Sequence, residues 1–240
     1  MGFALVSYAQ SSTDDTVNKH DFFLVIGQSN MAGRGEMKIR DSKPSTFINL
    51  FSDSGWVSGS HPYNRYSNIR KGSDIQQFGL IESFSRLLKR KGKFTEVNLL
   101  VNARGGSSIR QWLPGKSYLE KTKERLQEAL KYGSCLGIIW HQGESDRKNT
   151  QQYLDNLSIV VKELRKLTGP ETPFVAGQLA NWKDNSGPFN EMILKVPKVI
   201  KNSGVVELIR PYNHVGDSIH FDRRSLKKIG KLYAEKFLSL

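Results

Sequence analysis

A serine that follows a short apolar run is the first candidate for chemistry in this sequence. Residues 22–26 are all apolar, Gly27 comes next, and Ser29 stands two residues further on. An unbroken apolar run bounded by turn residues predicts a strand that is buried on both faces. Ser29 then falls where a helix would begin, and two interpretations are open. Its hydroxyl can cap that helix, or it can be a nucleophile at the carboxyl edge of a parallel sheet.

An acid and a histidine three residues apart offer the partners that a serine nucleophile needs. They are Asp217 and His220, in a segment that reads Asp-Ser-Ile-His-Phe. On one turn of the chain, Asp217 can hold the imidazole by one nitrogen and leave the other nitrogen facing outward. In that arrangement the histidine takes the proton of a serine hydroxyl while the carboxylate orients the ring. The residue types and their spacing therefore favour acyl transfer by Ser29, His220 and Asp217.

Acyl transfer also needs hydrogen-bond donors for the oxyanion of its tetrahedral intermediate. Three candidates are the backbone N–H of Ser29, the backbone N–H of Gly106 and the side-chain amide of Gln142. Gly106 is a candidate because two adjacent glycines, at 105 and 106, let a main chain approach closely. Each donor follows a predicted strand, and the carboxyl ends of parallel strands share one edge of the sheet. We therefore expect the three donors to converge.

Two further side chains of the segment 141–146 have supporting roles in this interpretation. His141 supports the loop after its strand, and Glu144 either competes with Asp217 as the orienting acid or fixes the site through hydrogen bonds, of which we favour the second. A metal site from His141, Glu144, Asp217 and His220 is conceivable, but the sequence has no spacing typical of metal ligands. Met31 stands where the second glycine of a G-x-S-x-G elbow would be, and no nucleotide-binding motif is present.

The elements that must position these residues alternate along the chain. Apolar runs or short extended segments predict strands at residues 22–26, 47–51, 97–101, 136–140, 173–179 and 205–209. Apolar residues at helical spacing, with their stop signals, predict helices at residues 78–91, 118–132, 153–167, 190–202 and 225–238. This alternation predicts an α/β fold with a mostly parallel sheet and helices on both of its faces.

Length and composition limit the classes of protein that remain. The 240 residues suit one large α/β domain, which we place at residues 21–240 after an N-terminal tail or signal-peptide remnant at residues 1–20. The net charge is +13. Its local clusters, at residues 86–93 and 223–231, fall on predicted helices, where a solvated face is expected, and we do not expect nucleic-acid binding. No apolar run approaches the ~18 residues of a membrane span.

At the segments that carry the candidate site residues, the sequence resembles the SGNH hydrolases. More narrowly, it resembles the sialic-acid-specific acetylesterase and acetyl xylan esterase group, carbohydrate esterase family six. The matching segments are residues 26–33, 105–107, 140–146 and 217–221. The resemblance implies a three-layer α/β/α sandwich, SGNH or flavodoxin-like, with a sheet of about five parallel strands. It implies Ser29 as nucleophile, His220 as base and Asp217 as its acid partner, with oxyanion donors from Ser29, Gly106 and Gln142, and no metal or cofactor.

We therefore expect a secreted or periplasmic serine esterase that removes O-acetyl groups from a polysaccharide or oligosaccharide through an acyl-enzyme on Ser29. Acetyl xylan is the first substrate and O-acetylated sialic acid is the alternative. The candidates for substrate binding are Gln28, Asn30, Arg34, Arg110 and Trp112. A non-catalytic carbohydrate-binding protein of the same fold and a lipase-like SGNH enzyme are the competing classes. The oligomeric state stays open.

Overall fold

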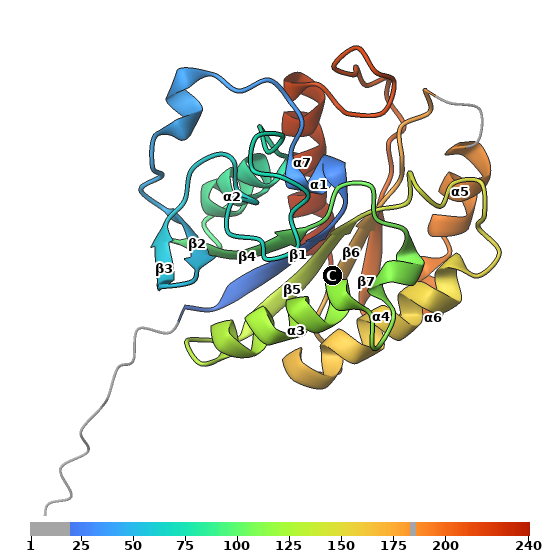
Figure 1. Cartoon of the computed structure of the whole chain (residues 1–240), viewed down its shortest axis with the longest axis horizontal. Coiled ribbons are helices and arrows are strands. Elements are labelled where there is room, and N and C mark those ends of the chain that lie inside the picture. Colours follow the sequence, from blue (N-terminus) through green and yellow to red (C-terminus); the bar gives the residue numbers. More distant parts are fainter. Residues whose placement is uncertain (1–19, 183–185) are drawn as a thin grey trace, which may run out of the picture.

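A seven-stranded sheet runs through the computed structural model, which describes residues 20–182 and 186–240 (Figure 1). The strands are β1 (Phe22–Gly27), β2 (Ile48–Ser52), β3 (Gly55–Ser58), β4 (Val97–Ala103), β5 (Cys135–His141), β6 (Phe174–Gly177) and β7 (Ser203–Val206). Their order is β3-β2-β4-β1-β5-β6-β7, and every neighbouring pair is parallel except β2 and β3. The mostly parallel sheet is confirmed. The expected count of about five strands was too low, chiefly because β3 is a four-residue hairpin partner of β2 with no apolar run.

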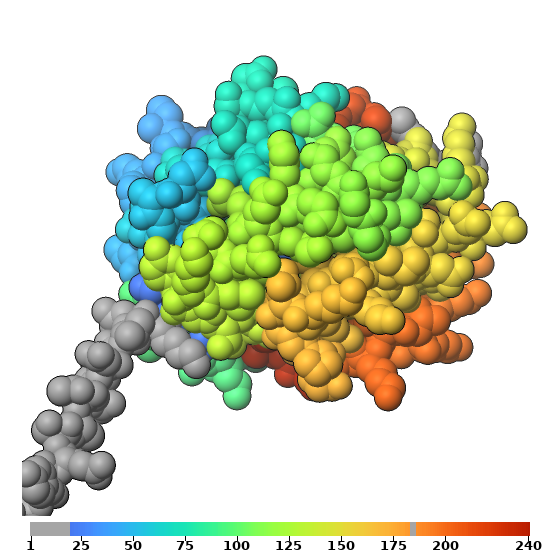
Figure 2. Space-filling model, turned by 60° about the horizontal axis from the view of Figure 1, so that its bottom comes forward, coloured from blue at the N-terminus to red at the C-terminus, as the bar shows by residue number. Residues whose placement is uncertain are grey.

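Helices cover both faces of the sheet and make three layers, as predicted. On one face lie α2 (Ile81–Arg90) and α7 (Arg223–Leu238), packed against each other. On the other lie α3 (Ser117–Leu130) and α4 (Tyr153–Thr168), which Figure 2 shows side by side in yellow-green and gold. The shorter helices are α1 (Ser29–Ala32), α5 (Ser186–Ile193), α6 (Val196–Val199) and the 3₁₀ turns Ile39–Ser42 and Ile109–Trp112. The helix expected at 190–202 is thus two helices, and Pro197 lies in the first turn of α6 rather than at a kink.

Strand β1 lies at the centre of the sheet, and all of its residues are buried. It pairs with β4 on one side and β5 on the other, so that Gly27 is aligned with both Ala103 and His141. A side chain at Gly27 would place its Cβ 2.1 Å from the carbonyl oxygen of His141, and its φ of +140° also disfavours other residues. The carboxyl ends of β1, β4 and β5 therefore lie side by side, as the motifs required.

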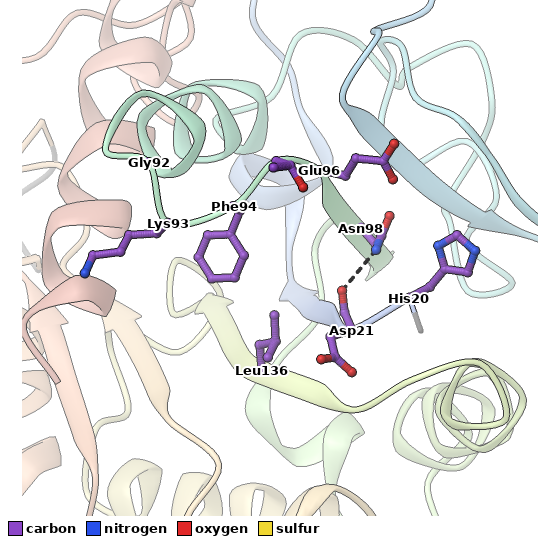
Figure 3. Close-up of a pocket in the computed structure, with 9 residues that line it drawn as sticks. His20, Asp21, Gly92, Lys93, Phe94, Glu96, Asn98 and Leu136 are labelled. Carbon is purple, nitrogen blue, oxygen red and sulfur yellow. Dashed lines mark hydrogen bonds between the residues drawn. The ribbon is translucent and has the colours of Figure 1, made fainter. Parts of the chain in front are cut away.

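The amino edge of the sheet carries a separate cavity of about 610 Å³ beside the start of β1 (Figure 3). Asn98 donates a hydrogen bond to the carbonyl oxygen of Asp21 there, and the Asp21 carboxylate accepts the backbone N–H of Ser134. The side chains of Asn98 and Asp21 thus link the residue before β1 to β4 and to the residue before β5. Apart from His20, the predicted tail at residues 1–20 lies outside the described residues. Among the helices of the described residues, none is long and apolar enough to cross a membrane.

Candidate active site

The structure brings Ser29, His220 and Asp217 together in one chain of hydrogen bonds. Ser29 begins α1 directly after the carboxyl end of β1, and its Oγ lies 2.9 Å from Nε2 of His220. Nδ1 of the same imidazole lies 2.5 Å from Oδ2 of Asp217. A histidine held in this way can accept the serine proton at Nε2 while the carboxylate fixes the Nδ1–H tautomer. Ser29 and His220 are 191 positions apart, and the sheet edge is what makes them neighbours.

A tight turn fixes the carboxylate of Asp217 before it reaches the imidazole. Its Oδ1 accepts the backbone N–H groups of Ile219 and His220, both at 2.9 Å. Burial alone would raise the pKa of Asp217, but these two bonds and the bond with the imidazole outweigh it and lower the pKa to about 2. Asp217 is therefore a carboxylate at every pH at which the protein would work. Helix α7 begins just after this turn because the side chain of Asp222 caps it, accepting the N–H of Ser225 at 2.7 Å.

Ser29 and His220 open into a cavity of about 590 Å³, which we call the Ser29 cavity. Its lining includes Gln28, Ser29, Arg34, Lys71, Asp74, Gly105, Gly106, Glu144, Ser145, Arg147, Asp217, Ile219 and His220. Three of these side chains are cationic, on Arg34, Lys71 and Arg147. The cavity is large enough for a sugar residue, and its charged and amide side chains can form hydrogen bonds with the hydroxyl groups of a ligand.

Two of the three predicted oxyanion donors, Ser29 and Gly106, lie at the Ser29 cavity. The N–H of Ser29 belongs to the first turn of a helix, where N–H groups have no intrahelical acceptor. Gly106 lines the cavity with a φ of +73°. Its neighbour Gly105 passes so close to Ser29 that a side chain there would place its Cβ 3.6 Å from that of the serine and 2.7 Å from Nη2 of Arg34. A glycine pair therefore does bring this main chain up to the nucleophile.

Gln142, the third predicted donor, lies away from the Ser29 cavity, and this corrects the prediction. Its side chain is fully buried and does not line the Ser29 cavity. Its Nε2 donates to the carbonyl of Ser107 at 2.8 Å and to Oδ2 of Asp146 at 2.5 Å, which uses both of its hydrogens. It lies also within 3.2 Å of Oε1 of Gln28. Gln142 thus holds the loop that carries Gly106, and Gln28, whose Oε1 faces inward, is the amide that lines the cavity.

Asn30 was predicted to bind substrate, but in the structure its side chain holds the His220 segment instead. Its side chain is 1 % exposed. Oδ1 accepts the backbone N–H of Phe221 at 3.0 Å, and Nδ2 donates to the carbonyl of Ile219 at 3.1 Å and to Oε1 of Glu144 at 2.5 Å. One amide therefore ties the helix of the nucleophile to both backbone neighbours of the base. We refer to these three bonds as the Asn30 clamp.

Glu144 and His141 lie behind this clamp. The Glu144 side chain is 11 % exposed, and burial, partly offset by the bond from Asn30, raises the pKa of its carboxyl to about 7. His141 is fully buried, which lowers its pKa to about 4, and its Nδ1 lies 2.8 Å from the hydroxyl of Tyr233. That hydroxyl donates to the carbonyl of Trp140. Neither residue contacts Ser29 or His220 by a hydrogen bond, so both are placed to support the site.

Two of the candidates for substrate binding lie elsewhere. Trp112 is fully buried, with its ring centroid 5.3 Å from that of Trp140 and its Nε1 donating to Oγ of Ser107, so it belongs to the core. Arg110 is exposed and does not line the Ser29 cavity. Sequence reasoning missed Lys71 and Arg147, which do line it, because both stand in loops without periodicity. In residues 20–182 and 186–240, no group of three or more His, Cys, Asp or Glu side chains is arranged to hold a metal ion.

Comparisons with known proteins show the family and the fold. A family model described as carbohydrate esterase, sialic acid-specific acetylesterase, matches residues 19–239. A probable carbohydrate esterase of Arabidopsis thaliana is 24 % identical over 243 residues, which cover 92 % of this chain and 91 % of the relative. A solved structure of that plant protein superposes with a TM-score of 0.78, at 22 % identity, over 92 % of this chain and 98 % of the other.

Two more distant solved structures share the fold. NanS is 16 % identical with a TM-score of 0.68, covering 92 % of this chain and 98 % of the other. Axe2 of Geobacillus stearothermophilus, described as an acetyl xylan esterase, is 14 % identical with a TM-score of 0.50, covering 92 % and 94 %. These likenesses support the three-layer α/β/α architecture.

Proposed function

We propose that this chain, which belongs to the carbohydrate esterase family of sialic acid-specific acetylesterases, removes O-acetyl groups from carbohydrates with Ser29 as its nucleophile. The observation that carries the proposal is the continuous hydrogen-bond chain from Oγ of Ser29 through the imidazole of His220 to Asp217, with distances of 2.9 Å and 2.5 Å. A serine that merely capped α1 would have no need of a base and an orienting acid in line with its hydroxyl.

The geometry supports the following steps. Oγ of Ser29 attacks the acetyl carbonyl carbon while Nε2 of His220 takes its proton, and Asp217 stabilises the resulting imidazolium. The oxyanion is stabilised by the N–H groups of Ser29 and Gly106. As the intermediate collapses, the imidazolium gives its proton to the departing sugar hydroxyl and leaves an acetyl-serine. Water then attacks that ester with His220 as its base, and acetate leaves.

The charges of the Ser29 cavity favour an acetylated sugar that carries a carboxylate. Arg34, Lys71 and Arg147 line it. Of the acids in the lining, Asp217 is engaged by His220, and the raised pKa of Glu144 keeps part of that carboxyl neutral. Only Asp74 adds a further carboxylate beside the cations. We therefore place O-acetylated sialic acid first, and acetyl xylan second. Axe2, described as an acetyl xylan esterase, keeps xylan a candidate.

The test is acetate release by the wild type and by Ser29→Ala from 4-nitrophenyl acetate, O-acetylated sialic acid and acetylated xylan. Ser145→Ala is the matched control, because this exposed serine lines the same cavity. We expect Ser29→Ala to lose about 10³-fold or more of the activity on every ester, and Ser145→Ala to lose less than about tenfold. If the wild type is inert on all three esters, or if Ser29→Ala is as active as the wild type, the proposal that Ser29 is the nucleophile is wrong.

A further inference from the structure

A second cavity, on the α2 and α7 side of the sheet, gathers positive charge that the esterase site does not use. It measures about 480 Å³ and lies between α2, α7 and the loop around residues 40–45. Six cationic side chains line it, on Arg40, Lys43, Arg86, Arg223, Lys227 and Lys231. The sequence clusters at 86–93 and 223–231 were expected on solvated helix faces. The packing of α2 on α7 brings Arg86 of the first cluster to the same place as Arg223, Lys227 and Lys231 of the second. We call it the basic cavity.

The two carboxylates of the basic cavity already have partners. Asp41 forms a two-point ion pair with Arg223, whose Nη2 lies 2.6 Å from Oδ1. Glu82 accepts from Arg86 at 2.7 Å and from His61 at 3.2 Å. Burial would raise the pKa of each acid, but the bonds to these partners outweigh it and lower both to about 2. The two carboxylates offset only part of the positive charge of the six cations.

Four of the six cations have no carboxylate partner in an ion pair among the described residues. Within the described part of the chain, none of Arg40, Lys43, Lys227 and Lys231 forms an ion pair with a carboxylate. Lys227 is half-buried, and burial together with the nearby charges of Arg223 and Arg40 lowers its pKa, although the charges of Glu82 and Asp41 offset part of that effect. Cations held this close repel one another, and a bound anion would offset that repulsion. The lining is thus complementary to a ligand with more than one negative charge.

The basic cavity is continuous in sequence with the Ser29 cavity. The segment from Arg34 to Lys43 lines the Ser29 cavity at its start and the basic cavity at its end, and α7 begins three residues after His220. From Arg223 to Lys231 the helix rises about 12 Å, at ~1.5 Å per residue, which is longer than one sugar ring. The two cavities are therefore joined by the segment 34–43 and by the start of α7.

We propose that the basic cavity binds the carboxylates of an acidic carbohydrate chain, away from the ester under attack. That the occupant is a carbohydrate rests on the proposed esterase function, whereas its negative charge follows from the cavity alone. Single-stranded nucleic acid fits less well, because Tyr63, the aromatic residue of the lining, is 5 % exposed and offers no face for stacking a base.

Binding of end-labelled polygalacturonate oligomers, measured by fluorescence anisotropy, tests this proposal without any ester. The variant Arg40→Ala/Lys43→Ala/Lys231→Ala removes three exposed cations of the cavity. Its control, Lys121→Ala/Lys162→Ala/Lys198→Ala, removes the same charge from exposed positions on α3, α4 and α6. Hydrolysis of 4-nitrophenyl acetate, assayed separately, reports whether each variant is folded and whether the esterase function itself holds.

We expect the cavity variant to bind polygalacturonate at least about tenfold more weakly than wild type, and the control variant to bind within about twofold. Binding by wild type should also weaken more steeply with added salt than binding by the cavity variant. Equal binding by the cavity variant and the wild type, or binding of neutral xylan oligomers as tight as that of polygalacturonate, would overturn the proposal. Tighter binding of duplex DNA of equal charge would overturn the choice of a carbohydrate.

Discussion

Replacing Asp217 by asparagine would separate the two tasks that the structure gives to this side chain. Its Oδ1 holds the turn by accepting two backbone N–H groups, and its Oδ2 accepts the Nδ1–H of His220. In Asp217→Asn the amide oxygen can keep the first task. The amide nitrogen, however, donates, so Nδ1 must become an acceptor and the proton moves to Nε2. An imidazole with its proton on Nε2 cannot accept the proton of Ser29.

The size of the effect follows from this change of tautomer. With the serine and the base still in place but the tautomer wrong, losses of ~10³–10⁴ in kcat are typical of a serine triad. That corresponds to about 4–5.5 kcal/mol of transition-state stabilisation, at ~1.36 kcal/mol per tenfold. The Asp217 side chain is 40 % exposed, so water can replace part of its interaction with the imidazole, and we expect the lower end, about 10³-fold.

The assay is kcat and KM on 4-nitrophenyl acetate, with thermal unfolding measured on the same samples. Asp74→Asn is the control, since Asp74 is an exposed acid in the lining of the same cavity, and its kcat should stay within tenfold of wild type. Asp217→Asn should lose kcat while its Tm stays within a few degrees. A folded Asp217→Asn with a kcat within tenfold of wild type would refute the role of Asp217 as the orienting acid, and Glu144 would be the next candidate.

Three further predictions concern the groups around this triad. Asn30→Ala removes the clamp and leaves the N–H of Phe221 unpaired, so kcat should fall about 10²-fold and the free energy of unfolding in urea by about 2–3 kcal/mol. The pKa of Glu144, raised from 4.5 to about 7, means that the folded chain binds its proton more tightly than the unfolded chain, so stability falls as pH rises between these values. Glu144→Gln removes that loss and should be about 1–3 kcal/mol more stable than wild type at pH 8, but not at pH 4. Gly27→Ala forces a Cβ to within 2.1 Å of the His141 carbonyl oxygen and should cost about 3 kcal/mol or more in thermal unfolding.

Each of these changes has a matched control in the chain. Asn149→Ala and Glu124→Gln alter exposed positions, and Gly187→Ala adds a Cβ that meets nothing within 4 Å. An Asn30→Ala enzyme as fast as wild type would show that the clamp does not position His220. A stability difference for Glu144→Gln that is the same at pH 4 and pH 8 would mean that the carboxyl titrates normally. A Gly27→Ala protein as stable as the Gly187→Ala control would contradict the packing of β1 on β5.

The centre of the fold and the triad could be predicted from the sequence because strong local patterns define them. The apolar run of β1 is unbroken and those of β4 and β5 are mostly apolar. Because the carboxyl ends of parallel strands share an edge, the polar segments after them had to meet. The spacing of Asp217 and His220 fits a single turn, which the structure contains.

The direction of side chains beyond the strand ends could not be predicted. Gln142 follows its strand directly and Asn30 stands next to Ser29, yet both turn inward to backbone and buried partners, because no periodicity fixes the rotation of a loop residue. Trp112 was expected at a sugar-binding surface because it lies between predicted elements. It is buried because the 3₁₀ turn that carries it packs on β5 and α4. Lys71 and Arg147 enter the Ser29 cavity through loops whose course depends on the whole fold.

The separation of Ser29 from His220 along the chain has a consequence for the newly made protein. Ser29 leaves the ribosome 191 residues ahead of the base that would activate it. At a synthesis rate of ~5–20 residues per second, the nucleophile waits roughly 10–40 s without its partner. The turn at Asp217 and the start of α7 must then dock on an already formed sheet edge, where the Asn30 side chain receives them. A nascent or truncated chain that stops before residue 217 would therefore lack both His220 and the helix α7 that covers one face of the sheet, and hydrolytic activity would report completion of the chain.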